Sequence, residues 1–364
     1  MGEVTKIYNP DYVIHPGEYL EEILESREIK KRDFAERIGL SVKAVSQIIN
    51  GKSLYSPDVA LMMEKTLNVS AEVWMNMSEA FQLHTAREKE KKHLETEKTK
   101  EWVKKFPTAD LKRKGLITDT RKSEVLADSL LRFLNVSSPE VWDKYNKKKA
   151  VSYRKSDKFE EAGEATAVWI RLAEREAEKV DTDKYNHSRF KVVLNKIRNL
   201  TVLLPNKYYS EMVDLCSSAG VALVLVPELK GTHISGAACW LSQHKVIIAV
   251  SLRYKTNDHF WFTFFHEAAH ILFHGKKNVY LDIKDGGSSA EELEADNFAG
   301  KLLIPEKEYK QFVQQNRFTA SDIKRFSKEI NIHPGIVVGR LQHDGFIEYS
   351  RLNELKERYE VDSD

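Results

Sequence analysis

The chain has 364 residues and a formal net charge of +2. Its length predicts two or three domains, and its small charge excludes DNA binding driven by the field of the whole molecule, so any basic surface must be local. No apolar run is long enough to span a membrane, and the segment Met1 to Lys6 lacks the core of a signal peptide. With only two cysteines, Cys216 and Cys239, which we expect to be buried free thiols, these features predict a cytoplasmic protein.

The first predicted elements have helix-turn-helix spacing. Residues 31–38 predict a short helix, Gly39 suits a left-handed turn, and Ser41 can cap a second helix that ends at Asn50. Positions expected to pack between the helices carry Ala35, Val45 and Ile48. The spacing therefore predicts a DNA-reading unit, with an ordinary helical hairpin as the alternative.

Side chains on the outer face of this second helix are the candidates for DNA contact. In such units the early turns of the second helix face base edges and nearby basic residues face phosphates. The candidates are Ser41, Val42, Lys43, Ser46, Gln47 and Lys52, with Lys31 and Arg32 as further phosphate contacts. The segment from Ile14 to Phe81 resembles the HigA-type branch of the Cro/repressor-like helix-turn-helix family over five predicted helices. That resemblance implies operator DNA as a partner, and we expect a homodimer because such proteins commonly pair on palindromic sites.

A charged helical region follows. Residues 84–105 are dominated by Glu, Lys and Arg and predict an exposed linking helix, with a nucleic-acid-binding stripe as the alternative. Residues 134–142 then echo residues 67–74, each placing Asn-Val-Ser before an apolar helix, which predicts a second, connecting or dimerising helical module. Residues 160–179 predict a helix that could pack on the next domain.

The strongest chemical signal is the sequence from His266 to His270, His-Glu-Ala-Ala-His. It lies in a predicted helix with Asn257 or Asp258 as N-cap and Gly275 at the C-cap. Aromatic and aliphatic residues cover nearly every side of that helix, so we expect it to be buried. Polar groups in such a helix are costly unless they are paired or bind a metal.

A helix places two imidazoles four residues apart on one face, which is the spacing of a zinc site. Hydrolytic zinc sites use three protein ligands and keep a fourth position for water. His266 and His270 are the predicted ligands, and Glu267 is the predicted general base. The alternative is a chance match between satisfied core histidines.

The third ligand is expected from a second helix, residues 291–304, ended by Pro305. His274 is a poor candidate, because eight residues of helix place it about 12 Å along the axis from His266. Glu292 lies at the edge of the buried stripe and is the predicted ligand, with Glu294 as runner-up. Asp296, one turn on, is placed to hydrogen-bond a ligating histidine. The alternative is a solvated acidic first turn.

These motifs, HEAAH followed by the glutamate-containing helix, resemble the ImmA/IrrE family of gluzincin-like metallopeptidases. The resemblance extends over residues 200–350. It implies zinc held by His266, His270 and Glu292, with Glu267 as the base. Members of that family cleave a transcriptional repressor in response to stress or mobile-element signals.

Three expectations concern the surroundings of this site. Residues 245–252 predict a strand, either an exposed edge that aligns substrate or a buried sheet strand. A donor for the oxyanion could be any of His233, Arg253, Tyr254 and His259. Residues 319–349 predict a helical hairpin that closes over the peptidase, and its His-Pro-Gly, repeated from His15, suggests a shared capping arrangement.

We therefore predict a mostly helical α+β protein. Its domains are an all-α helix-turn-helix domain (1–83), a charged helical linker and connecting module (84–199), and a gluzincin-like peptidase domain with a small β-sheet (200–364). The predicted function is a DNA-binding zinc metallopeptidase, with Mn²⁺ or Fe²⁺ as other possible metals, that cleaves a transcriptional regulator or toxin–antitoxin partner. The alternatives are an antitoxin-like autorepressor whose peptidase-like domain only senses or binds, and a zinc enzyme acting on a small amide.

Overall fold

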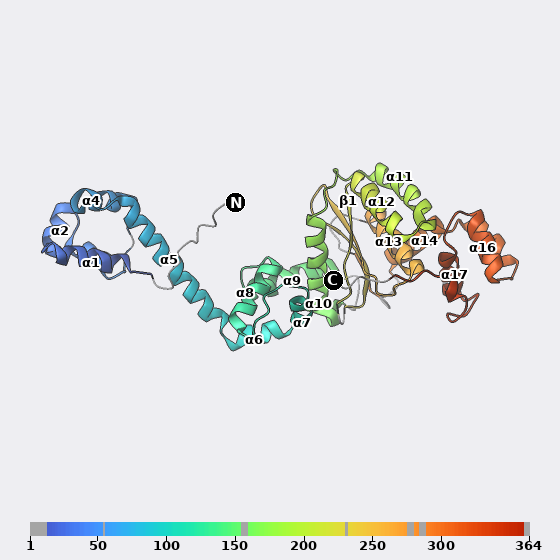
Figure 1. Cartoon of the computed structure of the whole chain (residues 1–364), viewed down its shortest axis with the longest axis horizontal. Coiled ribbons are helices and arrows are strands. Elements are labelled where there is room, and N and C mark those ends of the chain that lie inside the picture. The colour runs from blue at the N-terminus through green and yellow to red at the C-terminus, as the bar shows by residue number, and fades with distance from the viewer. Residues whose placement is uncertain are drawn as a thin grey trace, which may run out of the picture. The chain divides into compact units, whose positions relative to one another are not determined.

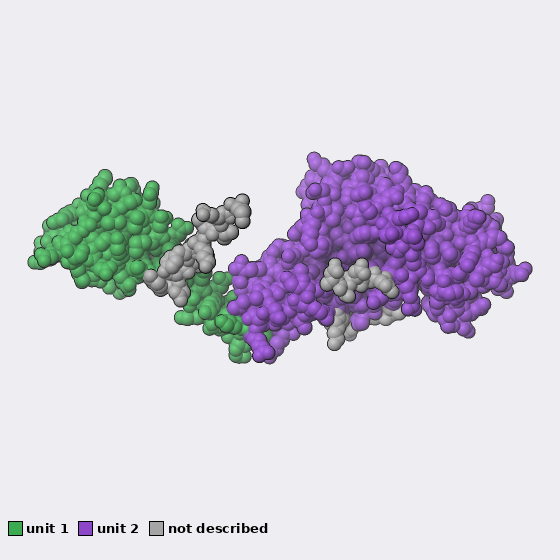
Figure 2. Space-filling view, in the orientation of Figure 1, with its two compact units in different colours: residues 1–100, 122–124 green, residues 101–121, 125–364 purple. Residues whose placement is uncertain are grey.

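The computed structural model describes residues 13–53, 55–153, 159–229, 232–274, 280–283 and 289–359. It divides into two compact units, residues 1–100 with 122–124 and residues 101–121 with 125–364 (Figure 2). Helices dominate both, and a four-stranded sheet lies in the second (Figure 1). The predicted fold class, mostly helical α+β, is confirmed. No helix in the described ranges combines the length and the apolar character that crossing a membrane requires.

The first unit is a bundle of short helices followed by a long one. They are α1 (Pro16–Ser26), α2 (Lys31–Ile38), α3 (Val42–Ile49), α4 (Pro57–Leu67) and α5 (Ala71–Leu94). Gly39 ends α2 in the left-handed conformation (φ 71°), and the Ser41 side chain caps α3 by accepting from the amide of Ala44. Ala35, Val45 and Ile48 are buried. The helix-turn-helix geometry predicted from the glycine and the cap is therefore present.

The two His-Pro-Gly segments share one cap. The His15 imidazole accepts a hydrogen bond from the Gly17 amide at 2.9 Å, and the His333 imidazole accepts one from the Gly335 amide at 3.0 Å. In each case proline occupies the first helical turn, where its missing N–H costs nothing. The repeat is a shared capping arrangement, as predicted.

The connecting region consists of several helices. After α5 come α6 (Glu97–Lys104), α7 (Thr108–Arg113), α8 (Ser123–Leu134), α9 (Pro139–Tyr153) and α10 (Phe159–Glu178). The prediction of a single linking helix over residues 84–105 is wrong, because one helix ends at Leu94 and the next begins at Glu97. The predicted boundary at residue 83 falls inside α5.

The echo between residues 67–74 and 134–142 has a structural basis. Asn68 and Asn135 both adopt positive φ (50° and 55°) just after a helix, and Ser70 and Ser138 accept a hydrogen bond from the first turn of the next helix. Asparagine tolerates this left-handed conformation better than most residues. The repeat is therefore a common way to join two helices.

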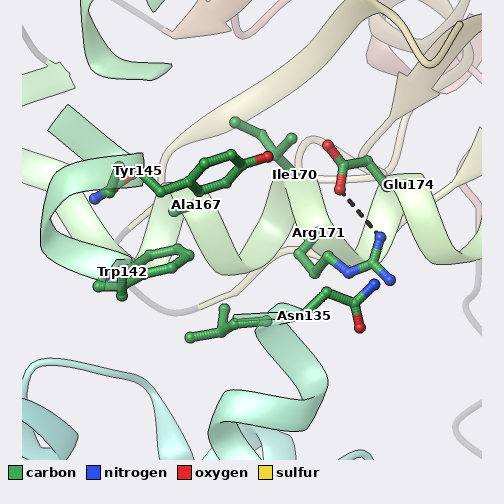
Figure 3. Close-up of a pocket in the computed structure, with 9 residues that line it drawn as sticks. Asn135, Trp142, Tyr145, Ala167, Ile170, Arg171 and Glu174 are labelled. Atoms are coloured by element: carbon green, nitrogen blue, oxygen red, sulfur yellow. Dashed lines mark hydrogen bonds and ion pairs between the residues drawn. The ribbon is translucent and has the colours of Figure 1, made fainter. Parts of the chain in front are cut away.

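A small pocket of about 150 Å³ lies where α8, α9 and α10 meet (Figure 3). The Arg171 guanidinium on its wall donates to the backbone carbonyl of Phe133 at 3.2 Å and to the Glu174 carboxylate at 3.1 Å. The bond to Phe133 ties α10 to the end of α8. Helix α10 also packs against β1 (Val221–Leu225) and β3 (Val246–Val250), as expected for the helix predicted at residues 160–179.

The sheet has the order β1-β3-β2-β4. β3 pairs in parallel with β1 and antiparallel with β2 (Ile234–Trp240), which pairs antiparallel with β4 (Tyr280–Ile283). The predicted strand at residues 245–252 is thus an interior strand with all five residues buried. Its backbone groups are used on both sides, so of the two alternatives the buried sheet strand is confirmed and the exposed, substrate-aligning edge is wrong.

Helix α13 (Asn257–Phe273) is the centre of the second unit. It packs against β2 and β3, against α14 (Ala290–Leu303) and against α17 (Pro334–His343). The remaining elements are α11 (His187–Asn199), α12 (Pro205–Ser218), α15 (Glu306–Gln314), α16 (Ala320–Glu329) and the short 3₁₀ helices Leu200–Val202 and Asn353–Leu355. The predicted C-terminal hairpin is α16 and α17, which contact each other, and α17 lies directly on α13.

The start of α13 is fixed by the end of the chain. Thr256, and not Asn257 or Asp258, is its N-cap. The Asn257 amide donates to the Glu357 carbonyl at 3.0 Å, and the Lys356 ammonium lies 2.6 Å from the Asp258 carboxylate. The predicted cap residues thus hold the C-terminal segment against α13. The helix ends at Phe273, and Gly275 lies outside the described residues.

Candidate metal centre

Three side chains from two helices converge in the second unit. His266 and His270 lie on α13 and Glu292 lies in the first turn of α14. The two Nε2 atoms are 3.0 Å apart, and the Glu292 carboxylate oxygens lie 3.1 Å from Nε2 of His266 and 3.6 Å from Nε2 of His270. These residues are the three that the sequence predicts as ligands.

Asp296 determines which nitrogen of His266 faces this centre as an acceptor. Its carboxylate lies 2.8 Å from Nδ1 of His266. A carboxylate accepts, so Nδ1 carries the proton and Nε2 of the neutral ring keeps its lone pair. Asp296 thus occupies the supporting position predicted for it, one turn after Glu292.

A second chain of hydrogen bonds does the same for His270. The Glu294 carboxylate lies 3.3 Å from Nε2 of His274, and Nδ1 of His274 lies 2.9 Å from Nδ1 of His270. Because Glu294 accepts from Nε2 of His274, Nδ1 of that neutral ring is the acceptor and Nδ1 of His270 is the donor. Nε2 of His270 then keeps its lone pair. His274, which the sequence made a poor ligand candidate, and Glu294, the runner-up to Glu292, thus support a ligand candidate.

The result is three acceptors that face one another. Two imidazole lone pairs and a carboxylate repel each other unless a cation lies between them. Two zinc–nitrogen bonds at a tetrahedral angle separate their nitrogen atoms by about 3.3 Å, close to the distances observed here. The donor set, two imidazoles and one carboxylate, also suits zinc. These residues therefore fit a divalent metal ion.

The surroundings of this centre favour the protonation states in which its side chains bind a metal ion. Desolvation lowers the pKa of His270, which favours the neutral imidazole that a metal requires. Burial alone would raise the pKa of Glu292, but the proximity of the His266 and His270 imidazoles outweighs it and lowers the pKa to about 2. The carboxylate is thus ionised at neutral pH. The Tyr280 ring from β4 stacks on His270 with centroids 4.3 Å apart and holds it in place.

Glu267 lies on the sheet side of the same helix turn. It is fully buried, and it fits there because β2 has glycine at position 236. A Cβ atom on Gly236 would lie 2.8 Å from a Glu267 carboxylate oxygen and 2.6 Å from the Thr263 methyl group. Sequence reasoning missed the roles of Gly236 and Tyr280, because only the packing of β2 and β4 against α13 gives them meaning.

The four candidates for an oxyanion donor contact one another, since the Arg253 guanidinium lies 5.3 Å from the centroid of the Tyr254 ring and joins two further contacts. Arg253 donates to the backbone carbonyl of His233 at 2.7 Å and lies 3.0 Å from Nδ1 of its ring. Tyr254 stacks on His259 with ring centroids 4.2 Å apart. His259 lies on α13 two turns before His266, about 10 Å along the helix axis. At this distance its ring is too far away to contact an oxyanion at the three converging side chains.

The candidate DNA contacts lie on one face of α3 and the following turn. Ser41, Val42, Lys43, Gln47 and Lys52 are exposed, and Ser46 is half-buried and accepts from the Asn50 side chain. Ser41 is also the cap of α3. Lys31 pairs with Glu21 and Arg32 pairs with Glu36. The exposed positions thus present a mostly uncharged face with lysines at its ends.

Comparisons with known proteins agree with both regions. Residues 20–74 match the family model described as helix-turn-helix, and residues 224–342 match the model described as IrrE N-terminal-like domain. An uncharacterised helix-turn-helix-type transcriptional regulator of Escherichia coli, YddM, is 25% identical over 71 residues, which cover 20% of this chain and 76% of that protein.

Solved structures are also similar to part of the chain. An addiction module antidote protein of the HigA family from Coxiella burnetii is 30% identical with a TM-score of 0.21, covering 23% of this chain and 92% of that one. The antitoxin HigA of Pseudomonas aeruginosa, solved with its promoter, is 31% identical with a TM-score of 0.22, covering 24% and 95%.

The two family matches define the class of protein. The chain carries a helix-turn-helix domain of the regulator type, followed by an IrrE N-terminal-like, peptidase-like domain. Both resemblances recognised in the sequence are confirmed for these segments. The histidines, Glu267 and Glu292 all lie inside the second matched range.

Proposed function

We propose that the chain is a DNA-binding zinc metallopeptidase that cleaves a transcriptional regulator or a toxin–antitoxin partner. The carrying observation is the convergence of acceptor atoms from His266, His270 and Glu292. Neighbouring side chains fix both imidazoles, and the buried Glu267 directly follows His266. Manganese or iron would meet the same ligands, but two imidazoles favour zinc over harder ions.

His266, His270 and Glu292 would hold the metal. When bound, zinc supplies Lewis acidity that polarises a peptide carbonyl and makes water a better nucleophile at neutral pH. Glu267 accepts the proton of the attacking water and donates it to the nitrogen of the departing amine. The near-complete burial of its surroundings excludes bulk water, so the proton stays with this carboxyl group between the two steps.

The helix-turn-helix domain supports a regulatory role. Its exposed α3 face, the family match and the similarity to a transcriptional regulator favour binding to duplex DNA, with a homodimer on a palindromic operator. A DNA-binding arm joined to a peptidase-like domain favours a protein substrate that acts at the same operator, such as a repressor or antitoxin, over a small amide. We place its use in a stress or mobile-element response.

The decisive test combines metal content with cleavage. We expect about one zinc per chain in the wild type and in Glu267→Gln, and none in His266→Ala. A co-expressed regulator encoded beside this protein should be cleaved by the wild type and by Glu308→Gln, a matched change of an exposed glutamate on α15, but not by Glu267→Gln.

Two outcomes would contradict the proposal. Full cleavage by zinc-loaded Glu267→Gln would exclude the general-base role. Stoichiometric zinc with no cleavage by the wild type would favour the binding-module alternative, in which the domain senses or binds a partner without proteolysis.

A further inference from the structure

A groove runs along α13 from the candidate metal centre toward the start of the helix. It has a volume of about 600 Å³ and lies between α13, α14 and α17. Thr263, one turn before Glu267, and Asp296, which bonds His266, both line it. The groove therefore adjoins the place where a peptide bond would be cut. Its volume is in the range of sites that enclose a ligand.

Part of the surface of the groove is apolar. Its buried or half-buried apolar lining residues are Phe262, Leu303, Ile304 and Ile336. They come from three segments that pack together only in the folded unit. An apolar side chain that enters the groove removes its own surface and theirs from water, which favours binding in proportion to the area covered.

The charged groups of the groove already have fixed partners. The Asp258 carboxylate lies 2.6 Å from the Lys356 ammonium, and the Arg340 guanidinium lies 2.8 Å from the Asp344 carboxylate. Two glycines leave the space that these ion pairs occupy. A Cβ on Gly339 would lie 2.5 Å from the Asp258 carboxylate, and one on Gly300 would lie 2.2 Å from the Arg340 guanidinium. At these two pairs a charged substrate side chain would therefore lose hydration without gaining a new partner.

Two stacked rings form one wall. Tyr254 and His259 lie face to face with centroids 4.2 Å apart and an interplanar angle of 21°. His259 lies about 10 Å from His266 along the axis of α13, a distance that about three residues of an extended peptide span. A flat wall at this distance can contact a large side chain near the scissile bond but not the reacting carbonyl.

We propose that this groove recognises one large uncharged side chain of the substrate, aromatic or long aliphatic, within about three residues of the scissile bond. The groove then selects the cleavage site, and Tyr254 and His259 are specificity-determining residues. This inference rests on the proposed peptidase function and adds the chemical class of its substrate.

The test measures binding, so that it does not depend on turnover. The probes are four peptide hydroxamates that differ only in the side chain three residues from the metal-chelating group, which is benzyl, isobutyl, methyl or carboxyethyl. With the zinc-loaded full chain, we expect the benzyl and isobutyl compounds to bind at least tenfold more tightly than the other two.

Two tryptophan variants locate the preference. His259 is exposed on α13, so His259→Trp can fill the groove without disturbing the core. It should reduce the benzyl preference to less than threefold. Lys324→Trp, at an exposed position of α16 that does not line the groove, should keep it. Ile336→Ala removes apolar surface from the lining of the groove, so it should weaken binding of the isobutyl compound at least threefold.

The outcomes separate the two levels of the proposal. Equal binding of all four compounds, or a full benzyl preference in His259→Trp, would overturn the groove as the recognition site while leaving the metal centre standing. No binding of any compound, including the methyl one, would overturn the proposed metal centre and with it the inference.

Discussion

Lys43 and Gln47 project from α3 into solvent, whereas His266, Glu267 and His270 lie in α13, a helix with most of its residues buried. The core of the first unit is formed by apolar residues such as Leu20, Phe34 and Val45, which do not take part in the proposed function. In the second unit the chemical groups and the core share one helix. Function and stability should therefore separate in the first unit and be coupled in the second.

Removing the metal should sharpen this contrast most. Metal binds only the folded state, so removing it should destabilise the second unit. If the zinc-loaded sample contains free zinc at about 1,000-fold its dissociation constant, we expect a strong chelator to lower the free energy of unfolding of this unit by about 4 kcal/mol. The first unit should not change. Calorimetric unfolding with and without chelator checks this, and a matching shift in the helix-turn-helix transition would contradict it.

A change that adds one methyl group should show how tightly the buried site is packed. Gly236→Ala would press on Thr263 and Glu267, so we expect a loss of about 1–3 kcal/mol in stability and at least a tenfold loss of cleavage, with zinc retained. The double variant Gly236→Ala with Thr263→Ser, which removes the closest methyl group, should recover part of both losses. Denaturant unfolding and cleavage rates check this, and unchanged activity in Gly236→Ala would contradict it.

A substitution in the hydrogen-bond chain that supports His270 should have a smaller effect on the metal centre. His274→Ala removes the acceptor that fixes the His270 ring, so zinc affinity should fall about 10- to 100-fold, the range typical of such supporting residues. Glu294→Gln should have a smaller effect, and Glu308→Gln none. Competition with a chromogenic chelator measures these affinities. An unchanged affinity in His274→Ala would mean that the chain through His274 does not orient the ligand.

The smallest effect on stability should come from the outer face of α3. Gln47→Ala should weaken operator binding by about 1–3 kcal/mol if the side chain contacts a base, and should change the free energy of unfolding by less than about 0.5 kcal/mol. Val45→Ala, on the buried face of the same helix, should instead destabilise the unit by about 1–3 kcal/mol because Val45 is fully buried. Mobility-shift titration and thermal unfolding check the pair. A stability loss in Gln47→Ala as large as that in Val45→Ala would contradict the separation of function from stability.

Local patterns predicted much of both regions. Gly39 and Ser41 identified the helix-turn-helix because a left-handed turn and an N-cap depend on neighbouring residues. The spacing of His266 and His270 determined that they share a helix face, and the apolar stripe of α14 placed Glu292 at its edge. These arguments need only the geometry of a single helix.

Other features depended on contacts between distant segments. Asn257 and Asp258 looked like caps, but the C-terminal segment recruits them and Thr256 takes the cap position. The strand over residues 246–250 could have been an edge or an interior strand, and only its pairing with both β1 and β2 decided between them. Sequence periodicity carries no information on how many neighbours a strand has.

The sequence by itself determined the two helix types that matter, an exposed reading helix and a buried helix with two histidines, because each follows from residue spacing along one element. The tertiary structure decided the rest. It brought Glu292 to the histidines, used Asp296 and the His274–Glu294 pair to fix their rings, and opened the groove between α13, α14 and α17. These features join residues up to 114 positions apart in the chain, Ser235 and Tyr349, and only the packing of separate elements brings them together.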